Sequence, residues 1–249
     1  MTEYSANVDR DALLRAEGYR LLAAAFRYPD QTELRALFSE ELEVESALKP
    51  LAEALIPSVD DQLAGEYNRL FAQSVAVSPH ERAYTGGDLG PGLGQLSSLY
   101  EAFGLRCGGR DTEVPDHIGV ELEFAAFLCL KEALHQEEET PEAQEAVSIV
   151  RAARKTFMQE HLGRWVSAFA SKLQSAAHHP YYAELAHLLR EWVQKDFAGQ
   201  GWEMPVGGRH LPVVAPDGQT EPLDDEPMTC PSALQEEESV PLSTLLPSG

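Results

Sequence analysis

The sequence has few cysteines and no long apolar run. Its 249 residues include only three cysteines, Cys107, Cys129 and Cys230, which are far apart and form no C-x-x-C pair. That spacing is not typical of a disulfide framework or a zinc site, and it favours a reducing compartment. No stretch approaches the roughly 18 consecutive apolar residues that span a bilayer, and the first residues do not resemble a secretory signal. We therefore expect a soluble, cytoplasmic protein with no stable membrane insertion.

Basic residues are also scarce. The chain has 19 Lys and Arg against 41 Asp and Glu, which gives a formal net charge of −22. A chain of this charge repels nucleic-acid phosphates and anionic lipid, and it attracts a basic partner. Acidity can serve solubility alone, but it excludes nucleic acid from the partners that we expect.

Sequence motifs for catalysis are absent. There is no G-x-S-x-G or H-E-x-x-H motif, and GGDLGPGLG lacks both the G-K-[ST] ending of a P-loop and the preceding strand of a dinucleotide fold. His117 and Glu121 form an i, i+4 pair that could ligate a metal only with further ligands. The simpler interpretation makes Asp116 a helix cap and His117 a first-turn residue. We expect no enzyme activity, no metal and no bound cofactor.

Apolar residues before position 200 recur every three or four residues, which predicts an all-α fold. The first helices that we expect cover 9–28, capped by Asp9 or Asp11, then 32–38, 41–55, 60–71 and 96–105. Of the later helices, one is capped by Asp116, one starts at Thr140 and Pro141 with a break near 159–163, and the last runs from His179 and Pro180 through Trp192.

Two segments depart from this helical pattern. Residues 74–95 contain five glycines and two prolines, so we expect a functional loop that carries Glu81 and Tyr84. Residues 203–249 contain eight prolines, nine acidic residues and one arginine, a composition typical of an extended tail. The expected organisation is a single helical domain at 1–202 followed by an acidic tail at 203–249.

Seven segments, taken in order, resemble the TorD/DmsD/NarJ family of redox-enzyme maturation chaperones. They are YRLLAAAFRYPD, EYNRLF, SPHERAY, LYEAFGL, PDHIGVELEF, HLGRWVSAFASKL and HPYYAEL, and they cover roughly residues 16–192. The resemblance implies an all-helical bundle that binds the twin-arginine signal peptide, and often the apo catalytic subunit, of a molybdenum-cofactor oxidoreductase of the DMSO-reductase type. Such a chaperone supports cofactor insertion before assembly or export. The chain departs from many relatives in its long tail and in its P-H-E-R-A-Y loop, so we expect its peptide selectivity to differ from theirs.

A receptor for such a leader needs carboxylates beside an apolar groove. We expect Glu81, Asp116 and Glu121 to receive guanidinium groups, with His117 orienting Asp116 or meeting the peptide backbone. By resemblance, client binding also involves Pro79, and Arg20 aligns with a basic residue in some relatives. The residues that we expect to line the groove are Tyr67, Leu70, Phe71 and Tyr84.

Two other functions remain open at this point. The first is a nucleotide-dependent switch, with GTP bound by the glycine-rich loop. The second is a scaffold for subunit assembly that ignores the leader. The sequence is compatible with a monomer or a homodimer.

Overall fold

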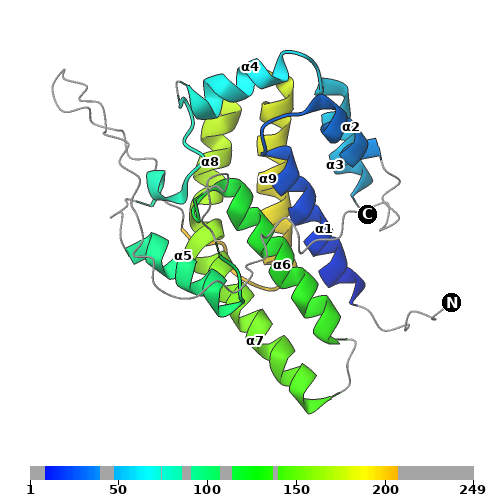
Figure 1. Ribbon diagram of the computed structural model, residues 1–249, viewed down its shortest axis with the longest axis vertical. Coiled ribbons are helices and arrows are strands. Elements are labelled where there is room, and N and C mark those ends of the chain that lie inside the picture. The colour runs from blue at the N-terminus through cyan, green and yellow to red at the C-terminus, as the bar shows by residue number, and fades with distance from the viewer. Residues whose placement is uncertain are drawn as a thin grey trace, which may run out of the picture.

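The protein is described by a computed structural model over residues 9–39, 48–73, 75–85, 91–106, 114–136 and 140–206. The regular structure in these ranges is helical, and no strand occurs in them (Figure 1). The α-helices are α1 Arg10–Ala25, α2 Gln31–Ser39, α3 Lys49–Leu55, α4 Leu63–Tyr67, α5 Pro91–Ala102, α6 Ile118–Gln136, α7 Pro141–Phe157, α8 Gly163–Ala176 and α9 Pro180–Gly199.

Helix α6 lies at the centre of the bundle (Figure 1). It packs against α1 on one side and α7 on the other, while α9 packs against α8 and returns to α1. Phe124 of α6 and Trp165 and Phe169 of α8 are fully buried in the shared core. The prediction of an all-α, single-domain bundle is confirmed.

Several helix starts are those that the sequence predicts. The Thr140 hydroxyl accepts a hydrogen bond from the Ala143 N–H at 3.1 Å, and Asp9 accepts one from the Ala12 N–H at 3.0 Å. Pro141 and Pro180 occupy first turns, where a missing N–H leaves no helical hydrogen bond unmade. These starts were predictable because caps act over three or four residues of chain.

Two π-helical turns interrupt the helices. One, Asn68–Ala72, continues α4, and the other, Met158–Leu162, joins α7 to α8, where the sequence predicts a break. Gly163 follows the second turn, and a Cβ atom there would lie 2.3 Å from the Met158 carbonyl oxygen. Such turns are often found at functional sites, and both of these lie beside predicted site residues.

The structure corrects several predicted boundaries. Helix α5 begins at Pro91 rather than at residue 96, because proline suits a first turn and the packing of Leu96 and Tyr100 outweighs the two glycines there. Helix α3 begins at Lys49, with Pro50 in its first turn, and residues 41–47 of the predicted helix lie outside the described ranges. Helix α9 continues past Trp192 to Gly199. Residues 40–47 and 86–90 lie outside the described ranges.

The predicted cap of α6 is also wrong. The Nδ1 atom of His117, not the Asp116 carboxylate, accepts a hydrogen bond from the first-turn N–H of Gly119 at 3.1 Å. The Asp116 side chain turns instead toward His80 and Arg82, which belong to another segment. Asp116 is therefore available for a role outside its own helix.

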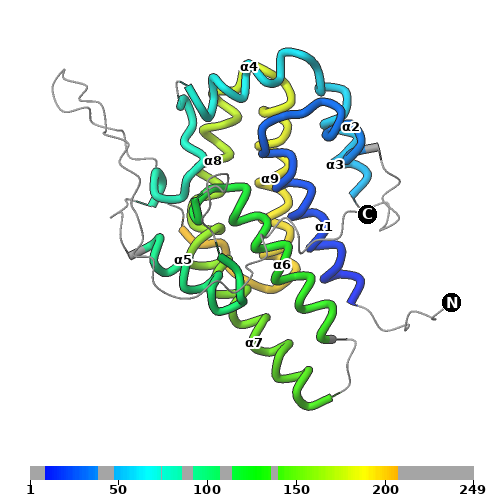
Figure 2. Tube along the Cα trace, viewed as in Figure 1, coloured from blue at the N-terminus to red at the C-terminus, as the bar shows by residue number. Residues whose placement is uncertain are grey.

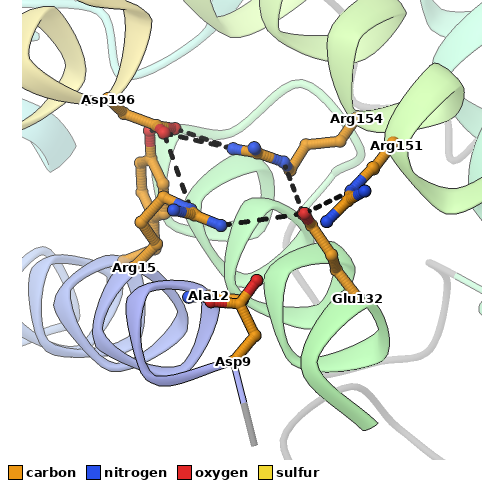
Figure 3. Close-up of polar contacts among 8 residues, drawn as sticks. Asp9, Ala12, Arg15, Glu132, Arg151, Arg154 and Asp196 are labelled. Atoms are coloured by element: carbon orange, nitrogen blue, oxygen red, sulfur yellow. Dashed lines mark hydrogen bonds and ion pairs between the residues drawn. The ribbon is translucent and has the colours of Figure 1, made fainter. Parts of the chain in front are cut away.

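A buried ion cluster joins several helices of the bundle (Figure 3). Arg154 of α7 is 1% exposed, and its Nη1 atom lies 3.1 Å from both carboxylate oxygens of Asp196 on α9. Its Nε atom lies 3.3 Å from Glu132 of α6, which Arg151 also binds at 2.7 Å. Tyr19 of α1 donates to Asp196 at 2.7 Å, so the cluster joins four helices.

The residues that follow α9 pack against this cluster. The Trp202 ring lies 4.8 Å from the Arg154 guanidinium and packs on Phe197. Residues 207–249, most of the predicted tail, lie outside the described ranges, and the division at residue 202 stays a prediction. In the part of the chain that the structure covers, no helix has the length and apolar character needed to cross a membrane.

Candidate functional site

Residues 75–85 follow the first π-helical turn and contact the N-terminal end of α6. This stretch descends beside α8 (Figure 2), with the Val77 N–H donating to the Leu70 carbonyl at 3.0 Å. Further along, the Pro79 carbonyl accepts from the Ile118 N–H at 2.8 Å, and the Glu81 N–H donates to the Asp116 carbonyl at 2.9 Å. The structure thereby brings together residues from the two segments that the sequence singles out.

Asp116 is the carboxylate at the point where residues 80–82 meet the N-terminal end of α6. It is 2% exposed, and its Oδ2 atom lies 3.4 Å from both the Nε and the backbone N of Arg82. Its Oδ1 atom lies 3.4 Å from the His80 Nδ1 but accepts no hydrogen bond. Burial acts to raise the pKa of Asp116, but the contacts with His80 and Arg82 outweigh it, so the pKa lies below its ordinary value. Asp116 is therefore ionised at neutral pH with incomplete hydrogen bonding.

Glu66 is a carboxylate in the same molecule whose two oxygens both accept hydrogen bonds. Arg69 binds it with two hydrogen bonds of 2.7 and 2.8 Å, and the backbone N–H groups of His178 and His179 donate to it as well. Burial acts to raise the pKa of Glu66, but these bonds lower it to about 2. Glu66 therefore has a structural role, whereas Asp116 has acceptor capacity to spare.

The other two predicted carboxylates face inward. Glu81 is 6% exposed, and its carboxylate lies 3.1 Å from the Nδ1 of His161 in the second π-helical turn. Glu121 is fully buried and accepts a hydrogen bond from the Trp165 indole at 3.0 Å. Burial first, and then the nearby charge of Glu81, raises the pKa of Glu121 well above its ordinary value. Glu121 favours its neutral form and offers no surface charge to a guanidinium group in this conformation.

His117 and Glu121 turn to different partners rather than forming a ligand pair. His117 is 6% exposed, and burial, followed by the proximity of His80, lowers its pKa to about 4. A neutral ring suits its acceptor role toward Gly119. Among the residues that the structure describes, no group of three histidine, cysteine or acidic side chains is placed to hold a metal ion.

An aromatic row marks the end of the bundle near α4. It consists of Tyr28, Tyr67, Phe71 and Tyr182, with successive ring centroids 5.3, 5.2 and 5.6 Å apart. Tyr67 and Phe71 are half-buried and Tyr28 is 59% exposed, so the row extends from the core to the surface.

The remaining predicted residues lie elsewhere. Leu70 and Tyr84 are enclosed in the core, where the Tyr84 ring packs on Trp165 and its hydroxyl donates to the Ser78 carbonyl at 2.9 Å. Arg20 lies on α1, where its guanidinium binds Glu17 at 2.8 Å. Of the residues expected to line a groove, Tyr67 and Phe71 are the two that reach the surface.

Comparison with known proteins identifies the family. The family model described as nitrate reductase delta subunit matches residues 17–171, which include every predicted site residue. The chain belongs to the nitrate reductase delta subunit family. The relatives of this chain include the selenate reductase assembly chaperone protein of Thauera selenatis, 31% identical over 78% of this chain and 93% of the relative.

Two further relatives carry similar names. The chlorate reductase assembly chaperone protein of Ideonella dechloratans is 31% identical over 72% of this chain and 86% of its own length. The chaperone protein TorD of Vibrio cholerae serotype O1 is 28% identical over 73% of this chain and 90% of its own length. These names confirm the resemblance to maturation chaperones and agree with the prediction that the chain is not an enzyme.

Four residues around the predicted site were not singled out by sequence reasoning. His80 and Arg82 contact Asp116, and they stand within the SPHERAY segment that carries the resemblance. His161 and Trp165 hold Glu81 and Glu121 from 80 and 44 residues away. The first pair could have been found from the segment itself, whereas nothing local signals the second pair.

Proposed function

We propose that this chain is an assembly chaperone for a molybdenum-cofactor oxidoreductase. It binds the arginine-bearing leader of the apo catalytic subunit and holds that subunit until the cofactor is inserted. Family membership supports the general role, as do relatives named for the assembly of selenate and chlorate reductases. The net charge of −22 favours association with a basic segment.

The observation that carries this proposal is the incomplete hydrogen bonding of Asp116. A buried carboxylate oxygen without a hydrogen bond is unfavourable, and such groups in native proteins call for an explanation. One explanation is a partner that supplies the missing donor. An arginine can donate two parallel hydrogen bonds to a carboxylate at about 2.7–2.9 Å, which shortens both contacts relative to the 3.4 Å found for Asp116.

The aromatic row is the surface that we assign to the apolar part of the leader. Residues 75–85 run between this row and Asp116. The Val77 N–H donates a hydrogen bond to the Leu70 carbonyl, next to Phe71, and the Pro79 carbonyl accepts one from the Ile118 N–H, near Asp116. Val77 and Pro79 are two residues apart, a span of at most about 7 Å in an extended chain, and the leader is proposed to follow residues 75–85 from Asp116 toward the row. A basic head followed by an apolar stretch matches this order of carboxylate and aromatic rings.

Calorimetric titration with a synthetic leader tests the proposal. The probe is a peptide of about 30 residues with two arginines ahead of an apolar stretch. We expect Asp116→Asn to weaken binding about ten-fold or more, because a hydrogen bond to a charged group contributes about 1.5–3 kcal/mol. Glu145→Gln is the matched control, since it removes one negative charge from an exposed position on α7. Equal affinities for the two variants would contradict the assignment of Asp116.

The scaffold alternative is separated by a recovery experiment. Full-length apo catalytic subunit and the same subunit without its leader are each offered to the purified chain. Leader recognition predicts a clear loss of recovery for the truncated subunit. Equal recovery would favour a scaffold that reads the folded body of the client.

A further inference from the structure

We infer that Arg82 is an internal competitor for the client arginine. Its guanidinium occupies the Asp116 carboxylate in the free chaperone, and an arginine of the leader must displace it. The inference rests on the proposed function, and it adds a residue that sets the affinity of the site.

Arg82 is placed for this role by the turn that carries it. It lies in the 3-10 turn Glu81–Ala83, which is fixed to α6 by the hydrogen bond from the Glu81 N–H to the Asp116 carbonyl. The side chains of Arg82 and His80 are 34% and 24% exposed, whereas that of Asp116, which both contact, is 2% exposed. A client arginine that binds the Oδ2 atom of Asp116 therefore competes with Arg82 for it.

The contact between Arg82 and Asp116 is a weak one. The Nε atom lies 3.4 Å from the Oδ2 atom, which is longer than the 2.7–2.9 Å or so of a charge-assisted hydrogen bond. The backbone of Arg82 is held by the same oxygen at 3.4 Å, which ties the start of the side chain near the carboxylate. In the Arg69 and Glu66 pair, by contrast, both contacts are 2.8 Å or shorter. An arginine from another chain has no such tether and can align both of its N–H groups with the carboxylate.

The Arg82 cation balances the negative charge of Asp116 when no client is bound. An ionised carboxylate without any cation nearby is strongly disfavoured in a buried place. Arg82 supplies that cation and leaves the Oδ1 atom without a hydrogen bond. The balance favours exchange, because the leader replaces a poor contact with a good one and releases the Arg82 side chain to water.

The test is the affinity of the full chain for the synthetic twin-arginine leader after Arg82→Gln. Removing a competitor should tighten binding, and we expect about a two- to five-fold gain, the range that corresponds to a partly exposed ion pair. Arg190→Gln on α9 removes the same charge outside the site and controls for the general attraction of a more acidic protein. A leader with glutamines in place of its two arginines should show no gain, because it does not use Asp116.

The outcomes separate this inference from the proposed function. If the unmodified chain binds the leader and Asp116→Asn weakens it, but Arg82→Gln binds no tighter than Arg190→Gln, the competitor role is wrong and the proposed function stands. If no variant binds the leader, both are wrong.

A second readout does not depend on the leader. Burial raises the pKa of Asp116, and the contacts with His80 and then with Arg82 lower it, so Arg82→Gln should raise that pKa in an NMR titration of the carboxyl group, while Arg190→Gln should leave it unchanged. An unchanged Asp116 pKa in Arg82→Gln would overturn the pairing on which the inference depends.

Discussion

Replacing Glu121 with glutamine should make the protein less sensitive to rising pH. The Glu121 carboxyl is fully buried, and burial together with the charge of Glu81 raises its pKa well above the ordinary value of 4.5. Above about pH 4.5 the unfolded chain ionises this group while the folded protein keeps it protonated. Stability that is present below pH 4.5 is therefore lost as the pH rises, by about 1.4 kcal/mol per pH unit, until the folded-state pKa is reached.

Glutamine keeps an acceptor for the Trp165 indole and does not titrate, so the variant lacks this loss. Urea unfolding of both proteins at pH 5, 6 and 7, followed by circular dichroism, gives the dependence of each free energy of unfolding on pH. All other titrating groups are shared, so they cancel in the difference between the proteins. The free energy of unfolding of Glu121→Gln, relative to that of the unmodified protein, should therefore increase as the pH rises. Parallel dependences would show that Glu121 is ionised in the folded protein, and the interpretation of its environment would then be wrong.

Two further substitutions test the packing that positions the site. Arg154→Met should lower the free energy of unfolding by about 3–5 kcal/mol, because it leaves the buried carboxylates of Asp196 and Glu132 poorly paired. A loss below about 1 kcal/mol in urea unfolding would refute this expectation. Gly163→Ala should lower it by about 1–3 kcal/mol, since the new Cβ meets the Met158 carbonyl, whereas Gly94→Ala, with nothing within 4 Å, should be neutral or mildly stabilising; equal effects in thermal unfolding would contradict the close packing.

The helical architecture could be predicted because its signals are local. Helical spacing of apolar residues gave the fold class, and Thr140 with Pro141 gave a helix start that the structure reproduces. The start of α5 could not be placed in this way. Its first turn contains Gly92 and Gly94, which favour a loop by local preference, and the burial of Leu96 and Tyr100 decides otherwise.

The chemistry of the site was less accessible to sequence reasoning. Glu81 and Glu121 were expected, with Asp116, to receive guanidinium groups, but both are buried, which is uncommon for charged side chains. Their partners, His161 and Trp165, lie on distant parts of the chain and meet them only after α8 packs beside α6. The distinction between these inward carboxylates and Asp116 therefore depends on tertiary structure.

A double-mutant cycle between the chaperone and its leader tests the central claim most directly. The unmodified chain and Asp116→Asn are each titrated with a twin-arginine leader and with the same peptide carrying two glutamines. If Asp116 receives a leader arginine, the two changes are coupled, and we expect a coupling free energy of about 1.5 kcal/mol or more. Additive effects, within about 0.5 kcal/mol, would show that no leader arginine meets Asp116 and would contradict the account.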